Sequence, residues 1–115
     1  MKQKDKFAVI YVRQSAMESP EISDTSAEQE IECRRYAKEQ GYRVVGIFRD
    51  IFDEEIEIER VGFELMLDFI ADGGLHAVIV GGSDPFPEDL QQYGYDRELL
   101  QALGMKLLRV DNQRE

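Results

Sequence analysis

The sequence predicts an α/β domain, a three-layer fold built on a mostly parallel central sheet. Apolar, β-branched segments alternate with segments of helical periodicity, in the order βαβαβαβ. The segments between successive strands are long enough for crossover helices, which favour parallel neighbours. The chain has 115 residues, the length of one domain, so we expect residues 1–115 to form a single unit.

The first half of the chain supplies two strands and a helix. Residues 7–12 are a continuous apolar run, typical of a strand that is buried on both faces. A helix is expected to begin with a capping box at Thr25 and to end before Gly41, which suits a helix C-terminus. Residues 42–48 are again apolar and β-branched, and they are the second expected strand.

The second half repeats the alternation after an acidic segment. Five acids fall within residues 53–59, and we expect a solvated loop there rather than a short strand, because like charges repel. Residues 61–71 carry apolar side chains at helical spacing and are expected to form a helix. A strand over 76–81, a helix over 87–103 and a last strand over 105–110 complete the order.

Polar and titratable residues collect where the predicted strands end. In parallel α/β sheets the carboxyl ends of the strands lie at one edge, which is where binding and catalysis take place. The residues that this pattern brings to that edge are Arg13, Ser15, Asp50, Ser83, Asp84 and Asp111.

Charge and composition restrict the possible partners and cofactors. Asp and Glu total 24 against 14 Lys and Arg, a net charge of −10, so the chain as a whole should be repelled by DNA. With Cys33 and His76 as the single Cys and His, neither a disulfide nor a structural zinc site is expected within one chain. The glycine-rich segment that begins at residues 81 and 82 lacks the lysine of a P-loop, and we expect no cofactor. No apolar run reaches membrane-spanning length, so a cytoplasmic location is the default expectation.

The order of several motifs resembles a known family over residues 6–111. "IYVRQS", "SAEQEIECRRYAKEQGYRVVGIFRD", "ERVGFELML" and "HAVIV" followed by "SD" resemble the catalytic domain of the serine recombinases, the resolvase/invertase family. The resemblance implies a resolvase-like fold. It also implies a serine that attacks a DNA phosphate, leaving a phosphoserine link and a free 3′-hydroxyl, with arginines around the serine and no metal.

The resemblance carries functional residues over position by position. Ser15 matches the nucleophile, and Arg13 matches the arginine two residues before it. The other matched positions are Gln29, Asp50, Arg60 and Asp84.

The chain departs from the family pattern after the third strand. Where the family has the motif D-R-L-x-R, this chain has "DPFPE", so Pro85 and Glu88 replace two arginines. We also expect the 115 residues to lack the family's long dimerisation helix and its DNA-binding domain. The resemblance therefore implies a site-specific recombinase domain whose catalysis is impaired.

Other interpretations of these residues stay open. Ser15 is also compatible with a loop or capping role, Gln29 with a structural role, and Arg13 with an ion pair to Asp50 or Asp84. A non-enzymatic interaction module that reuses the fold is the main alternative, and phosphate chemistry on a small substrate is another. DNA, a second copy of the chain or another recombinase subunit are the partners that these interpretations imply.

Overall fold

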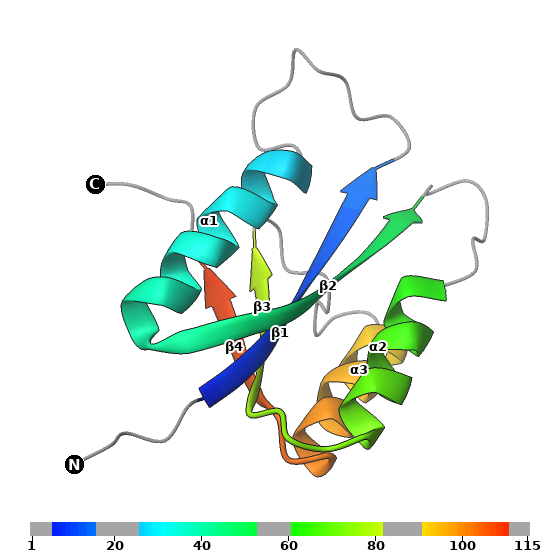
Figure 1. Ribbon diagram of the computed structural model, residues 1–115. Coiled ribbons are helices and arrows are strands. Elements are labelled where there is room, and N and C mark those ends of the chain that lie inside the picture. Colours follow the sequence, from blue (N-terminus) through cyan, green and yellow to red (C-terminus); the bar gives the residue numbers. More distant parts are fainter. Residues whose placement is uncertain (1–5, 16–25, 53–60, 82–90, 111–115) are drawn as a thin grey trace.

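The central sheet has four parallel strands in the order β2-β1-β3-β4 (Figure 1). The computed structural model describes residues 6–15, 26–52, 61–81 and 91–110. Within these ranges the strands are β1 (Lys6–Ser15), β2 (Tyr42–Phe52), β3 (Ala77–Gly81) and β4 (Lys106–Val110).

In the described part of the chain, three helices cover the sheet: α1 (Ser26–Gln40), α2 (Val61–Ala71) and α3 (Gln91–Ala102). The strand order reverses at β1, because β2 lies on one side of it and β3 and β4 lie on the other. Right-handed crossovers then place α1 on one face of the sheet and α2 and α3 on the opposite face, as Figure 1 shows. The result is the three-layer arrangement that the sequence predicts.

Alternate residues of β1 point to opposite faces of the sheet and belong to two separate hydrophobic clusters. On the α1 face, Ala8, Ile10 and Val12 pack with Cys33 and Ala37. On the opposite face lie the residues Val9, Tyr11, Phe63, Met66, Ile70 and Leu100. Strand β1 is therefore buried on both sides, as its continuous apolar run predicts.

The strands differ from the expected ones mainly in length. Strand β1 continues past residue 12 and pairs with β2 up to the Ser15–Phe52 pair. Asp50 therefore lies within β2 instead of following it, because the parallel ladder extends beyond the apolar core of both strands. The expected capping box at Thr25, the acidic loop over 53–59 and residues 87–90 lie outside the described residues. No helix within the described ranges is long and apolar enough to span a membrane.

Helix α1 approaches the end of β3 very closely at Cys33. A Cβ atom placed on Gly81 would lie 2.8 Å from the Cys33 sulfur, so any larger residue at this strand end would require the Cys33 side chain to shift. Burial raises the pKa of the Cys33 thiol to about 12, and the nearby charges of Glu32 and Glu30 add to the effect. The buried thiol therefore belongs to the packing of the α1 face.

The raised pKa of Cys33 predicts a loss of stability at alkaline pH. In the unfolded chain a thiol ionises near its ordinary pKa of about 8.5. The folded chain keeps the proton up to a pKa of about 12, so the unfolded state loses it first as pH rises. Between these two pKa values, the free energy of unfolding should fall by as much as about 1.4 kcal/mol per pH unit as pH rises, from this group alone.

A Cys33→Ala variant isolates this contribution from other groups that titrate at alkaline pH. Denaturant unfolding of both proteins gives the difference between their free energies of unfolding. We expect the advantage of the cysteine protein to shrink steadily between about pH 8.5 and pH 11. A difference that does not change with pH would contradict the burial of this thiol.

Candidate functional site

The carboxylate of Asp50 joins β1, β2 and the start of α2. Its Oδ1 accepts a hydrogen bond from the backbone N–H of Gly62 at 2.7 Å, and its Oδ2 accepts one from the N–H of Phe63 at 2.9 Å. The hydroxyl of Tyr11 donates to Oδ2 at 2.6 Å. Short hydrogen bonds to an ionised acceptor are among the stronger ones, and a carboxylate that is only 7% exposed needs them.

Asp50 acts as a long-range cap for α2. The first N–H groups of a helix have no partner inside the helix, and a residue just before the helix usually supplies one. Here the acceptor comes from a residue 12 and 13 positions earlier in the chain. The positive end of the helix dipole also favours a carboxylate at this place.

Gly62 permits the approach between α2 and β2. A Cβ atom at this position would lie 2.1 Å from the carbonyl oxygen of Arg49 and 2.9 Å from Oδ1 of Asp50. Any larger residue would separate the helix start from the strand. The backbone of β2, the Asp50 carboxylate and the first turn of α2 therefore form one tightly packed unit.

The parallel register brings the matched residues of β1 to this unit. Arg13 pairs with Asp50 along the ladder, and Ser15 pairs with Phe52, the last residue of β2. Tyr11, which binds Asp50, precedes Arg13 by two residues and Ser15 by four. The backbone of the predicted nucleophile thus emerges from a strand whose position is fixed by a buried hydrogen bond.

The remaining predicted site residues are not all placed together. Gln29 is 8% exposed and lies in the first turn of α1. Its backbone carbonyl oxygen would lie 3.3 Å from a Cβ atom placed on Gly81. It therefore reaches the same edge of the sheet as Asp50, but on the α1 face. Arg60 and Asp84 lie outside the described residues, as do Pro85 and Glu88.

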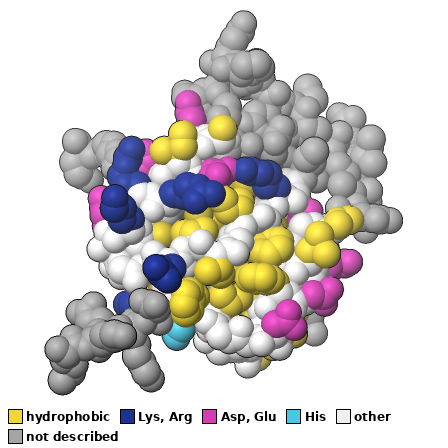
Figure 2. All heavy atoms as spheres, viewed as in Figure 1, with side chains coloured by type: hydrophobic (Ala, Val, Ile, Leu, Met, Phe, Trp, Pro, Cys, Tyr) yellow, Lys and Arg dark blue, Asp and Glu magenta, His cyan; other side chains and the backbone are white. Residues whose placement is uncertain are grey.

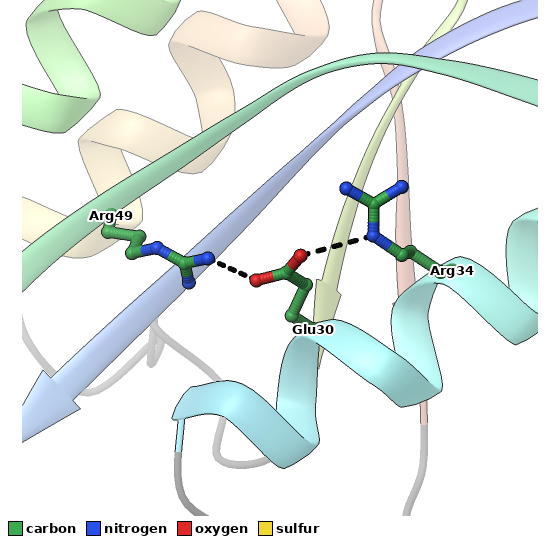
Figure 3. A network of polar contacts seen from close by, with 3 residues as sticks. All are labelled: Glu30, Arg34 and Arg49. Carbon is green, nitrogen blue, oxygen red and sulfur yellow. Dashed lines mark hydrogen bonds and ion pairs between the residues drawn. The ribbon is translucent and has the colours of Figure 1, made fainter.

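Arg49, which directly precedes Asp50, belongs to a polar network on the α1 face. Its guanidinium and that of Arg34 both bind the carboxylate of Glu30, from either side (Figure 3). The hydrogen bond from Arg49, and then that from Arg34, lowers the pKa of Glu30. Because the arginines are about half exposed, the network contributes little to stability, but the Glu30 carboxylate partly offsets the charges of Arg34 on α1 and Arg49 near the end of β2.

The sequence reasoning missed Tyr11 and Gly62. The Tyr hydroxyl within the apolar run over residues 7–12 is a signal, because a buried Tyr hydroxyl needs a partner. A glycine inside the first turn of a predicted helix is a second signal, since it marks a close backbone approach. In the described part of the chain, no group of three His, Cys, Asp or Glu residues is arranged to hold a metal ion.

The fold is that of a serine recombinase catalytic domain. The structure is similar to the C-terminal catalytic domain of ISC1926 TnpA, an IS607-like serine recombinase, with a TM-score of 0.68 and 23% identity. The match covers 95% of this chain and 70% of that chain. A comparison with curated proteins found no match.

The sequence match is to one family over nearly the whole chain. Residues 8–115 match the family described as "Resolvase, N terminal domain". The chain therefore belongs to the resolvase family, as the resemblance in its motifs implies.

The close approach at Gly62 predicts a large effect of a single methyl group. Alanine is ordinarily favoured over glycine in helices by about 0.5–1 kcal/mol. In Gly62→Ala, however, the Cβ atom would overlap the Arg49 carbonyl, so we expect a net loss of about 3 kcal/mol in the free energy of unfolding. Chemical denaturation measures this loss, and Glu64→Ala, exposed in the same turn, is the matched control.

The control should change stability by less than about 0.5 kcal/mol. If Gly62→Ala were as stable as the control, the tight contact between α2 and β2 would be wrong.

Proposed function

We propose that this chain is a serine-recombinase catalytic domain that keeps the framework for strand transfer on DNA but has impaired catalysis. The observation that carries the proposal is the Asp50 unit. The hydrogen bonds of Asp50 fix the end of β1 next to the start of α2. Asp50 pairs with Arg13 in the sheet, and Ser15 follows Arg13 by two residues. A nucleophile needs such a rigid support to meet a phosphate in line.

The proposed reaction is the transfer of a DNA phosphate to Ser15, as in the family. The hydroxyl oxygen of Ser15 would bond to phosphorus and give up its proton. The bond between phosphorus and the 3′ oxygen of DNA would break, and that oxygen would leave as a hydroxyl. Arg13 and Arg60 would offset the phosphate charge, while Asp50 would act as a positioning residue, since three donors already bind its carboxylate.

The same site has lost groups that this reaction needs. Pro85 and Glu88 stand where the family has arginines. Removing one donor that stabilises the transition state costs about a hundredfold to a thousandfold in rate, and here an acid replaces one of the two. The net charge of −10 further weakens attraction to DNA.

A second candidate function is a non-enzymatic interaction module. Apolar side chains on the outer side of α2 favour it, because they are exposed although the helix already buries another face. Its partner would be a second copy of the chain, another recombinase subunit or a different protein.

DNA cleavage with covalent trapping tests the proposed function. The substrate is a pool of labelled, nicked duplexes of random sequence, so no particular site is assumed. The proteins are the unaltered chain, Ser15→Ala, and a double variant with Pro85→Arg and Glu88→Arg. Thermal unfolding of each protein confirms that it is folded.

We expect little or no adduct from the unaltered chain and a serine-dependent adduct, at least tenfold more abundant, from the double variant. The adduct should disappear when Ser15→Ala is added to the double variant. An abundant adduct from the unaltered chain would contradict the impairment. Absence of any adduct, together with absence of salt-sensitive DNA binding, would favour the interaction module.

A further inference from the structure

Helix α2 carries a second apolar face that the fold does not bury. Val61, Leu65 and Phe69 are 52%, 55% and 37% exposed, and they recur at intervals of four residues. This spacing places them along one side of the helix, over about 12 Å. The core contacts of α2 come from different positions, Phe63, Met66 and Ile70.

The apolar face of the helix continues onto the edge strand β2. The rings of Phe69 and Phe48 are 5.7 Å apart, and Phe48 is only partly buried. A Cβ atom on Gly46 would lie 3.2 Å from the Phe48 ring and 3.5 Å from the Phe69 ring, so both rings lie close to the strand backbone at this position. We call Val61, Leu65, Phe69 and Phe48 the apolar band.

Exposed hydrophobic side chains are visible as a group on the face of the molecule drawn in Figure 2, with acidic side chains at their lower right border and Lys and Arg side chains above them. A contiguous exposed apolar group with a polar border is typical of an interaction site, whereas single exposed side chains are not.

An acidic row runs parallel to the band. Glu64, Asp68 and Asp72 are all exposed and repeat at the same interval of four residues, three positions after the members of the band on α2. Helix α2 contains no Lys or Arg. On the strand side, Arg43 takes part in an interaction within the chain. The charge along the helix side of the band is therefore uniformly negative.

The shape of the strand edge selects the type of occupant. Strand β2 is an edge of the sheet, a place where an added strand often pairs. Its register with β1 shifts between Ala8 and Val9, which leaves Val45 as an extra residue in β2. Such a bulge bends the edge and opposes strand addition, so a helix laid along the apolar band fits better.

We propose that the apolar band docks an amphipathic helix of another protein. That helix has apolar residues at intervals of three and four, and Lys or Arg on the flank that faces the acidic row. The inference does not depend on whether Ser15 reacts with DNA. It rests on exposure, spacing and charge complementarity at the described surface.

A second copy of the chain is a poorer occupant. Its helix α1 exposes one large apolar residue, Ile31, and no apolar row. Two of its basic residues, Arg34 and Arg35, are already paired with Glu30 and Glu32. The required combination of an apolar row with free basic flanks is absent from α1. Helix α2 of a second copy has the apolar row, but it carries Glu64 and Asp68 and no Lys or Arg, so two copies of α2 would bring like charges together. Neither of these helices fits, and we assign the docked helix to a different chain.

Synthetic helices provide the test. One labelled, helix-stabilised peptide of about 18 residues carries leucines at intervals of three and four, with lysines on both flanks. A second peptide has glutamates in place of the lysines, and a third has the basic composition in scrambled order. Fluorescence anisotropy measures their binding to the full 115-residue chain.

Four proteins are compared: the unaltered chain, Leu65→Lys, Asp68→Lys and Ile31→Lys. Ile31→Lys is the matched control, because Ile31 is 57% exposed, as Leu65 is 55% exposed, but lies on α1. Thermal unfolding checks each protein. If Leu65→Lys does not fold, Asp68→Lys, which alters only an exposed charge, still tests the inference.

We expect the basic peptide to bind the unaltered chain at least tenfold tighter than the acidic and scrambled peptides. Leu65→Lys should weaken this binding at least tenfold, Asp68→Lys should reduce the preference for the basic peptide, and Ile31→Lys should change it less than twofold. Equal binding of all peptides, no binding, or equal losses in Leu65→Lys and Ile31→Lys would overturn the proposal. Self-association in sedimentation that disappears in Leu65→Lys would also overturn it, because the occupant would then be a second copy.

Discussion

The carboxylate of Asp50 is the contact on which the arrangement of the described site depends. It is buried, and it binds one donor from β1 and two from the first turn of α2. A buried charge with fewer partners would cost free energy, so strand and helix must stay in place for the charge to be tolerated. Gly62 serves the same contact, because the absence of a side chain lets the helix start reach the strand backbone.

The two faces of the sheet serve different purposes at its carboxyl edge. On one face, Asp50 fixes the end of β1 that leads to Ser15, while α2 turns its apolar band outward. On the other face, Arg49 and Arg34 are held by Glu30 and α1 packs tightly against β3. A chain of the resolvase family thus combines a fixed strand end with an exposed apolar surface on the outer side of α2.

Much of the fold could be predicted from the sequence, because each strand is a short apolar run and each helix shows its own periodicity. The end of β2 could not, since Asp50 looks like the start of a loop until its pairing with Arg13 is known. Parallel register depends on contacts between distant segments, which local patterns do not contain. The roles of Tyr11 and Gly62 were missed for the same reason: each depends on a partner more than ten positions away.

Native-state hydrogen exchange at Gly62 and Phe63 is the most direct test of the central role of Asp50. Amides in the first turn of a helix usually exchange through local fraying. If the Asp50 carboxylate holds these two amides as described, they should exchange only through global unfolding, with the same opening free energy as the amide of Ile10 in β1. Exchange many orders of magnitude faster than at Ile10 would contradict the arrangement, because α2 would then open at its start without disturbing the sheet.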